Sequence, residues 1–242
     1  VFGDTGWQDY AALPARELMK LPRIEPLSHL ISVYGVAGLT AYFGLFDIGK
    51  PRDGETVVVS AAGGSVGSLV GQLAKIKGCR VVGVAGGRDK CEWVVKQLGF
   101  DACVDYKARG LFKALKAAAA NGVDVYFDNV GGDVLEAVLP QMNLRGRIVC
   151  CGAISQYDTA TAAPGPRGLP GLLVVKRLTM QGFIVTDFFR DRARAVADLQ
   201  KWVASGELKV FDDVTDGLEN APQALIGLLA GANRGKAMVR VS

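Results

Sequence analysis

Metal ligands and paired thiols are scarce in this sequence. It has a single histidine, His29, and five cysteines, none of which forms a C-x-x-C pair. Zinc sites take their ligands from clustered cysteine and histidine side chains, so we expect no metal site. The odd cysteine count and the length of 242 residues argue against a disulfide framework and favour a reducing cytoplasm. The adjacent Cys150 and Cys151 are interpreted as small apolar core residues.

Strong charge clustering is also lacking. The net charge is +4, and the basic residues are scattered along the chain, so the sequence does not predict a nucleic-acid partner. Residues 56–74 contain no charged side chain, which is long enough to raise the question of a membrane span. A glycine-serine turn at the centre of this stretch predicts a buried strand and helix of a soluble protein instead. No secretory signal is recognisable at the N-terminus, and we expect no membrane partner.

The stretch from Glu55 to Gly71 carries the clearest functional pattern. Residues 56–59 are β-branched and suit a buried parallel strand, and residues 60–65 are small. Apolar residues then recur at helical spacing from position 66 to position 73. Strand, glycine turn and helix in this order form the entrance of a dinucleotide-binding unit. Gly64 would let the backbone approach a pyrophosphate, and Gly67 would let the helix pack closely on the strand.

Two other interpretations of this stretch were weighed. The spacing Ala61-x-x-Gly64-x-x-Gly67 lacks the first glycine of the full fingerprint, and tight strand-to-helix packing alone would also use small residues. Residues 63–67 also match the G-x-S-x-G nucleophile elbow of α/β-hydrolases. That mechanism needs a histidine after the serine, and His29 precedes it. The hydrolase interpretation therefore fails on chain order.

Strands and helices alternate from residue 55 onward, which predicts an α/β fold with a doubly wound parallel sheet and right-handed crossovers. Before this region we expect a strand over 6–13, a proline-spaced stretch and a helix over 27–46. A proline- and glycine-rich loop over 155–171 is long enough to suggest a function. The expected strands are 55–60, 80–85, 102–104, 123–128, 146–151, 178–183 and 237–241, and the expected helices are 65–77, 89–98, 110–120, 132–142, 171–177, 190–204 and 220–230.

The end of the second strand indicates which dinucleotide binds. An NAD site places an acidic residue there, about 20 positions after the glycines. In this sequence the strand 80–85 runs into Gly86-Gly87-Arg88-Asp89-Lys90, so its tip is glycine and two cations follow. Arg88 and Lys90 would pair with the 2′-phosphate of NADP(H). The alternative is that both side chains only solvate the first turn of a helix.

Several segments recur together in the order of a known family. They are residues 38–42, the glycine turn 61–67, and residues 127–132, 151–157, 181–185, 217–222 and 231–236. On these segments the chain resembles the zinc-independent medium-chain dehydrogenase/reductases, in the branch of prostaglandin reductases, alkenal double-bond reductases and curcumin-reductase-like enzymes. The resemblance covers essentially the whole chain.

The resemblance implies NADPH-dependent reduction of the C=C bond of an α,β-unsaturated ketone or aldehyde. Hydride transfer to the β-carbon would leave an enolate whose oxygen needs a hydrogen-bond donor, and Tyr157 is the best phenolic candidate for this catalytic role. The resemblance also implies a homodimer joined through the edge of the cofactor-domain sheet. The implied cofactor-binding residues are Gly64, Ser65, Val66, Gly67, Lys90, Tyr106, Asn129, Cys151, Gly152, Ala153, Ile154, Ser155, Gln156, Tyr157, Phe183, Ile184, Val185 and Asn233.

The same resemblance implies a division of the chain into three parts. Residues 1–25 would be the remnant of a GroES-like catalytic domain, residues 26–205 the NADP-binding Rossmann domain, and residues 206–242 a segment returning toward the catalytic domain. Because that barrel forms one wall of the active site in the family, we expect this chain to be inactive alone. The alternatives are a zinc-independent quinone reductase and a non-catalytic NADPH-binding or redox-sensing module. A short-chain dehydrogenase is disfavoured because no tyrosine is followed four positions later by lysine.

Overall fold

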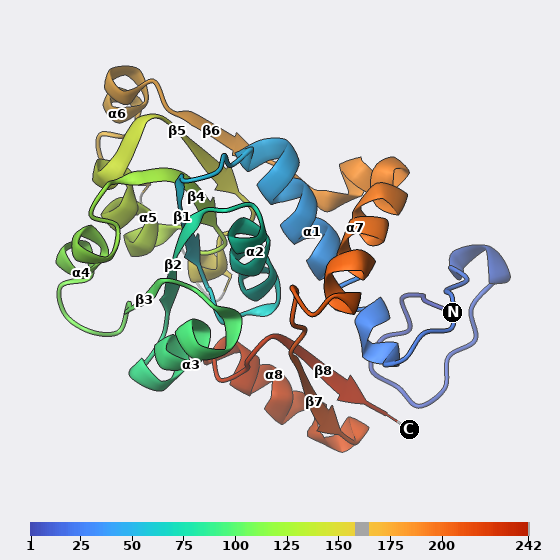
Figure 1. Cartoon of the computed structure of the whole chain (residues 1–242). Helices are drawn as coiled ribbons and strands as arrows, with labels where there is room; N and C mark the ends of the chain where they lie inside the picture. The colour runs from blue at the N-terminus through green and yellow to red at the C-terminus, as the bar shows by residue number, and fades with distance from the viewer. Residues whose placement is uncertain (158–164, 242) are drawn as a thin grey trace.

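The computed structural model describes residues 1–157 and 165–241. Its centre is a six-stranded parallel sheet in the order β3-β2-β1-β4-β5-β6, which confirms the predicted doubly wound fold (Figure 1). The strand order reverses between β1 and β4, the position where open α/β sheets bind ligands. The strands are β1 (Thr56–Ser60), β2 (Arg80–Ala85), β3 (Ala102–Asp105), β4 (Val123–Asp128), β5 (Met142–Cys150) and β6 (Thr179–Gly182).

Two hydrophobic cores lie on opposite faces of this sheet. Successive side chains of a strand point to opposite faces, and in β1 the side chains of Val57 and Val59 join one core while Val58 joins the other. Helices α1 (Val36–Phe43), α2 (Ser65–Ile76), α3 (Arg88–Leu98) and α7 (Arg192–Ala204) cover the first core. Helices α4 (Leu111–Ala118), α5 (Gly132–Val138) and α6 (Leu169–Lys176) cover the second. Burial on both faces explains the nearly continuous apolar strands.

The helix expected over 27–46 is broken into three pieces. A 3₁₀ turn spans Leu27–Leu30, α1 begins at Val36, and a π-helical turn spans Gly44–Gly49. The turn before α1 packs closely on the helix, since a Cβ on Gly38 would lie 1.7 Å from the Val33 carbonyl oxygen, so this packing requires glycine there. Elsewhere the helices differ from the expected ranges by a few residues at their ends. The helix expected over 132–142 is an α-helix only to Val138; a 3₁₀ turn spans Leu139–Gln141, and a strand begins at Met142.

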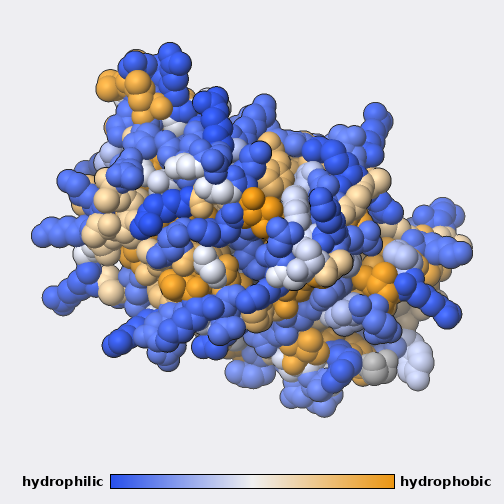
Figure 2. All heavy atoms as spheres, viewed as in Figure 1, coloured by the Kyte–Doolittle hydropathy of each residue, from blue (hydrophilic) through white to orange (hydrophobic). Residues whose placement is uncertain are grey.

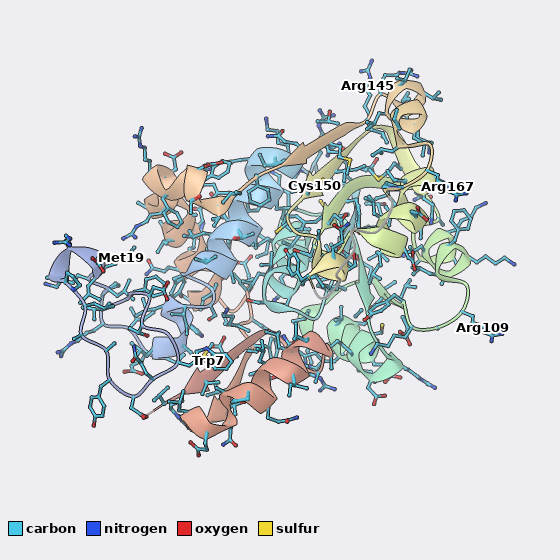
Figure 3. All side chains as sticks on the ribbon, turned by 180° about the vertical axis from the view of Figure 1, so that it is seen from behind. Trp7, Met19, Arg109, Arg145, Cys150 and Arg167 are labelled. Atoms are coloured by element: carbon cyan, nitrogen blue, oxygen red, sulfur yellow. The ribbon has the colours of Figure 1, made fainter. Side chains whose placement is uncertain are left out.

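The strand expected over 6–13 is absent, so that prediction was wrong. The N-terminal segment is mostly irregular, and its antiparallel contact is an isolated bridge between Phe2 and Met19. A strand needs a partner to accept and donate its backbone hydrogen bonds, and residues 6–13 have none in the described residues. Trp7 and Tyr10 are 61% and 91% exposed. Figure 3 shows Trp7 and Met19 on this segment, away from the central sheet.

A small second sheet lies beside α3 (Figure 1). It pairs β7 (Asp212–Asp216) with β8 (Lys236–Arg240) in parallel, and helix α8 (Ala221–Leu229) connects them. The sequence predicted α8 and β8 but missed β7, whose residues Asp212-Asp213-Val214-Thr215-Asp216 lack an apolar pattern. Pairing with β8, rather than the propensity of its own residues, gives β7 its conformation.

The face of the molecule shown in Figure 2 is mainly hydrophilic, with hydrophobic groups in small separate patches. No helix in the described part of the chain is long and apolar enough to cross a membrane. All five cysteines are free thiols; Cys79 and Cys91 are buried, and Cys150 and Cys151 are partly buried at the end of β5 (Figure 3). Within the long loop expected over 155–171, residues 158–164 lie outside the described residues.

Candidate functional site

The glycine turn between β1 and α2 is held by close backbone packing. A Cβ on Gly67 would lie 2.3 Å from the carbonyl oxygen of Ala61, so no larger residue fits there without displacing the turn. Gly64 donates its N–H to Ala61 O at 2.9 Å, and a Cβ on Gly64 would meet only that oxygen, at 3.2 Å. The outer side of Gly64 is therefore open for a ligand, while Gly67 fixes the helix against the strand.

The start of α2 carries unsatisfied polar groups. The helix begins at Ser65, and the N–H groups of a first helical turn have no acceptors within their own helix. The Ser65 hydroxyl is buried and, among the described residues, has no hydrogen-bond partner. A buried hydroxyl without a partner destabilises the fold unless a ligand or water satisfies it. This end of α2 therefore has the donors that an anionic group needs.

The C-terminal segment lies directly on this turn. Gly235 donates its N–H to Gly63 O at 2.9 Å, and the structure has a parallel bridge between Gly64 and Gly235. Asn233 precedes this contact and donates its side-chain amide to Gly235 O at 2.9 Å. Tertiary contact thus brings residues 231–235 to the glycine turn, although about 170 positions separate them in the sequence.

Lys90 and Tyr106 lie on opposite sides of the β2 end. The aliphatic part of Lys90 packs on Gly63, where a Cβ would be 3.0 Å from its Cγ and Cδ, and its ammonium donates to Gly231 O at 2.6 Å. Tyr106 packs on Gly86, with a Cβ there 2.9 Å from its ring. Burial lowers the pKa of Lys90, and the charges of Arg234 and Lys107 lower it further.

For Arg88 the structure supports the alternative interpretation of the sequence, in which its side chain only solvates the first turn of a helix. Its side chain is 88% exposed and pairs with Glu92 of the same helix at 3.0 Å. The structure therefore places it as a solvated cation of the first helical turn and does not bring it to Lys90.

A polar network organises the ends of β1 and β4. Asp128 Oδ1 accepts hydrogen bonds from the Tyr126 hydroxyl at 2.8 Å, from Ser60 at 3.2 Å, and from the backbone N–H groups of residues 130 and 131. Asn129 donates its side-chain amide to Ser60 O at 2.7 Å and its backbone N–H to the Ser60 hydroxyl at 2.8 Å. Burial raises the pKa of Tyr126, so its hydroxyl remains a donor at neutral pH. Asn129 is buried and positioned by β1.

The loop over 151–157 rests on this network. Cys151 and Gly152 donate their N–H groups to Asp128 O, and Ile154 donates to Asn129 O at 3.2 Å. The Ser155 hydroxyl donates to Val130 O at 2.6 Å. The Tyr157 hydroxyl accepts a long bond of 3.4 Å from the Ala153 N–H, and its side chain is 68% exposed. Ile154 is also 55% exposed. The side chains of Ile154 and Tyr157 therefore both face outward from the loop.

The three residues after β6 do not present their side chains in one direction. Phe183 packs at Gly44, where a Cβ would lie 2.6 Å from its ring, and it makes an edge contact with Phe188. Val185 is buried, whereas Ile184 is 66% exposed. Ile184 is therefore the member of this group whose side chain is open to a ligand, and the other two position it from the core.

Sequence reasoning missed two cations at this site, Lys107 and Arg234. Lys107 directly follows Tyr106, and its Cε lies 3.0 Å from where a Cβ on Gly86 would be. Arg234 directly follows Asn233, and its guanidinium lies over the Trp93 ring at 5.8 Å. In the sequence, the one indication of a role for Lys107 and Arg234 is that each directly follows a predicted cofactor-binding residue. Only the fold shows that both lie near Lys90.

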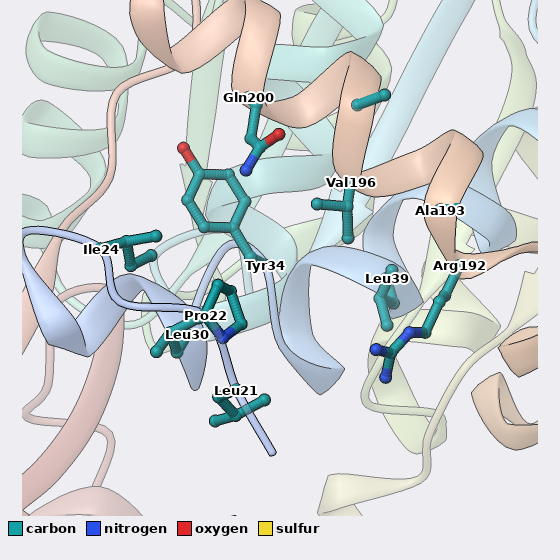
Figure 4. Close-up of a pocket in the computed structure, with 11 residues that line it drawn as sticks. Leu21, Pro22, Ile24, Leu30, Tyr34, Leu39, Arg192, Ala193, Val196 and Gln200 are labelled. Carbon is teal, nitrogen blue, oxygen red and sulfur yellow. The ribbon is translucent and has the colours of Figure 1, made fainter. Parts of the chain in front are cut away.

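A cavity of about 320 Å³ lies elsewhere, between the N-terminal segment, α1 and α7 (Figure 4). Apolar side chains dominate its lining, among them Leu21, Leu39 and Val196, with Tyr34 and Arg192 at its edge. It contains none of the predicted cofactor residues. The glycine turn and the strand ends carry the polar groups, so we place the functional site there.

Comparison with known proteins identifies the family. A family model described as zinc-binding dehydrogenase matches residues 65–202. The NADPH-dependent curcumin reductase of Escherichia coli is 45% identical over 100% of this chain and 72% of its own length. The chain belongs to this dehydrogenase family. Within it, the chain falls in the zinc-independent medium-chain branch of these reductases.

Two further relatives support this placement. The NADP(+)-dependent 2-alkenal reductase of Nicotiana tabacum is 42% identical over 100% of the chain and 71% of its own length. The crystal structure of CurA from Vibrio vulnificus in complex with NADPH has a TM-score of 0.92 and 46% identity, over 98% of the chain and 72% of that protein. The structural likeness therefore extends over nearly all of this chain.

The residues at the glycine turn fit a dinucleotide. Gly64 leaves space for a pyrophosphate, α2 offers N–H donors beside the unpartnered Ser65 hydroxyl, and Lys90 supplies positive charge at the β2 end. Neither Asp nor Glu occupies the tip of β2, where an NAD site would carry a carboxylate for the ribose. The site could hold NADP(H) along the switch point between β1 and β4.

Proposed function

We propose that this chain is the cofactor-binding portion of an NADPH-dependent oxidoreductase that reduces the C=C bond of α,β-unsaturated ketones or aldehydes. The observation that carries the proposal is the open glycine turn with its unpartnered Ser65 hydroxyl, next to a cation-lined strand end. Relatives described as curcumin and 2-alkenal reductases that use NADP(H) support the reaction class.

The adenosine end of the cofactor would lie over the glycine turn. The backbone of Gly64, Ser65, Val66 and Gly67 would hold the pyrophosphate, because the N-terminus of α2 points its free N–H groups outward there. Lys90 and Tyr106 would flank the 2′-phosphate, and Asn233 would close over the cofactor. Lys90 can exchange its bond to Gly231 O for a phosphate oxygen, since charge-assisted bonds to phosphate are stronger than those to a neutral carbonyl.

The nicotinamide end would lie along the loop 151–157 and the exposed side of Ile184, with Asn129 near the middle of the cofactor. When bound, NADPH supplies the hydride for the reduction. The chain's own contribution is orientation and a donor. Tyr157 would donate its hydroxyl to the substrate carbonyl oxygen, where negative charge develops. Its exposure leaves that hydroxyl accessible, and its bond to the Ala153 N–H leaves the proton available for donation.

A calorimetric titration with NADPH and, separately, NADH tests this function, using the wild type and Lys90→Ala. We expect the wild type to bind NADPH much more tightly than NADH, and Lys90→Ala to lose roughly 10- to 100-fold in NADPH affinity without losing NADH binding. A turnover assay with an enone and with a quinone, made on the chain with the GroES-like domain supplied, then separates an enone reductase from a quinone reductase. Cofactor binding with turnover of neither substrate would favour the non-catalytic module, and binding of neither cofactor would contradict the proposal.

We further propose that the protein forms a homodimer through the β6 edge of its sheet. β6 pairs with β5 on one side, and no other strand of the described residues covers its opposite side. Exposed strand edges readily pair with a second chain, and Val174 and Val175 of the neighbouring α6 are 74% and 68% exposed. Sedimentation should give twice the 25.6 kDa chain mass, and a monomer at all concentrations would contradict the dimer.

The remaining assignments concern the compartment and the division of the chain. We propose a cytoplasmic location because all five cysteines are free thiols, as in proteins of reducing compartments.

We also propose that residues 1–25 belong to a catalytic domain, residues 26–205 to the cofactor domain and residues 206–242 to a segment returning toward the catalytic domain. The backbone hydrogen bond from Gly235 to Gly63 O joins the last two parts and supports a shared role for them.

A further inference from the structure

Three cations lie near the end of β2, where the negative charge of Asp213 also acts on Lys90. They are Lys90 on α3, Lys107 after β3 and Arg234 in the C-terminal segment, and none of them forms a salt bridge within the described residues. Nearby cations behave differently, since Arg88 pairs with Glu92 and Arg240 pairs with Asp216. Like charges held together destabilise a fold unless an anion binds between them.

Packing on α3 holds Arg234 next to Lys90. Trp93 lies three residues after Lys90 and therefore on the same face of the helix. The Arg234 guanidinium lies over the Trp93 ring at 5.8 Å, and Phe211 supports that ring from its edge with centroids 5.0 Å apart. The Arg234 backbone N–H donates to Asp213 Oδ2 at 3.2 Å. The Arg234 guanidinium is thus packed on the Trp93 ring next to Lys90.

Lys107 approaches from the other side of the strand end. Its Cε and the ring of Tyr106 both lie against Gly86, within about 3 Å of where a Cβ would be. Asp105 Oδ1 fixes this corner by accepting the N–H groups of Gly87 at 2.7 Å and Lys107 at 2.9 Å. The charges of Arg234 and Lys107 lower the pKa of Lys90, while Asp213 acts in the opposite direction.

We propose that Arg234 and Lys107 complete, with Lys90, a three-cation site for the phosphate on the ribose 2′ oxygen, and so set the selectivity for NADPH over NADH. The inference rests on the proposed function and deepens it. A 2′-phosphate carries about −1.5 to −2 charges at neutral pH, which matches three converging cations. Because the Gly235 N–H is bonded to Gly63 O, Arg234 brings the C-terminal segment into contact with the same ligand.

The test measures binding by calorimetry for Arg234→Leu, Lys107→Leu and the double variant. The ligands are NADPH, NADH, 2′,5′-ADP and 5′-AMP, so that the 2′-phosphate is present in one member of each pair. We expect each single variant to bind NADPH and 2′,5′-ADP about tenfold more weakly, with NADH and 5′-AMP unchanged, because one charge-assisted contact to phosphate is lost. The double variant should lose more and depend less on salt.

The controls separate a phosphate contact from a structural role. Arg240→Leu removes the same charge from the same small sheet, where Arg240 pairs with Asp216, and should leave all four affinities unchanged. Arg234→Lys keeps the charge and should restore most of the loss. Lys107→Leu tests the site without altering the packing on Trp93, should Arg234→Leu fail to fold.

Two results would overturn the inference while leaving the proposed function intact. One is an equal loss for NADPH and NADH, which would assign Arg234 and Lys107 to the architecture of the site. The other is unchanged selectivity in the double variant, which would leave Lys90 and Tyr106 as the phosphate ligands. A wild type that binds neither NADPH nor NADH would instead contradict the proposed function, and with it the three-cation site.

Discussion

The two ends of the proposed cofactor groove are built in different ways. At the glycine turn, backbone meets backbone so closely that a Cβ on Gly67 would overlap Ala61 O at 2.3 Å. At the loop 151–157, backbone bonds to Asp128 and Asn129 hold the base, while Tyr157 and Ile154 extend outward with 68% and 55% exposure. In the proposed function, steric constraint would therefore fix where the cofactor's phosphates lie, whereas exposed side chains would provide the chemistry at the other end.

The largest effect is expected from Gly67→Val. The added side chain would displace the Ala61 carbonyl, so we expect the free energy of unfolding to fall by about 3 kcal/mol or more, together with loss of NADPH binding. Denaturant unfolding measures the change. Gly171→Ala in α6 is the matched control, since a Cβ there meets no atom within 4 Å, and it should not destabilise the protein. Normal stability of Gly67→Val would contradict the steric account.

Tyr157→Phe tests the opposite end. If the Tyr157 hydroxyl donates to the substrate oxygen, its removal should lower kcat for an enone by roughly 10- to 100-fold in the chain with the GroES-like domain supplied, and leave the Kd for NADPH unchanged. The matched variant Tyr106→Phe should do the reverse, weakening NADPH binding a few-fold with kcat retained, because it removes the hydroxyl that is proposed to flank the 2′-phosphate. If both variants changed kcat, or if both changed the Kd for NADPH, the proposed difference between the two ends of the site would be wrong.

Alkaline pH should destabilise the protein through the thiol of Cys151, which lies at the partly buried start of the loop 151–157. Burial raises the pKa of Cys151 to about 12, and the negative charge of Asp128 adds to this shift. The unfolded thiol would ionise near pH 9, while the folded one keeps its proton, so its stabilising contribution is complete below pH 9 and is lost as the pH rises toward 12. We expect a loss of roughly 1 kcal/mol per pH unit in that window, and a smaller slope in Cys151→Ala. Identical slopes in urea unfolding would contradict the assignment.

The smallest effect is expected from Arg88→Ala. Arg88 is next but one to Lys90 in sequence, yet its side chain is 88% exposed and paired with Glu92. Salt bridges at such exposed positions contribute little, so the Kd for NADPH should change by less than about twofold. Titration of Arg88→Ala beside Lys90→Ala measures the difference. A tenfold loss in Arg88→Ala would show that the guanidinium reaches the phosphate after all.

The core elements were predictable because their signals are local. The β-branched run of β1, the small residues at 60–65 and the helical spacing after them lie in one continuous stretch, and the structure forms β1 and α2 there. The strand expected over 6–13 failed for the opposite reason, because a strand depends on a partner that the segment itself does not contain. β7 was missed since its pairing with distant β8 stabilises a polar sequence.

The sequence by itself determined the doubly wound sheet, the glycine turn and the absence of a carboxylate at the β2 tip, since each follows from residue type and spacing within a short stretch. Only the tertiary structure decided which charges meet. Lys90 and Arg234 are 144 positions apart in the sequence, and the packing of residues 231–235 on Gly63 and Trp93 brings them to one site. It likewise turned Phe183 toward Gly44 and the core. Side-chain direction depends on contacts between distant segments, and local sequence patterns do not encode those contacts.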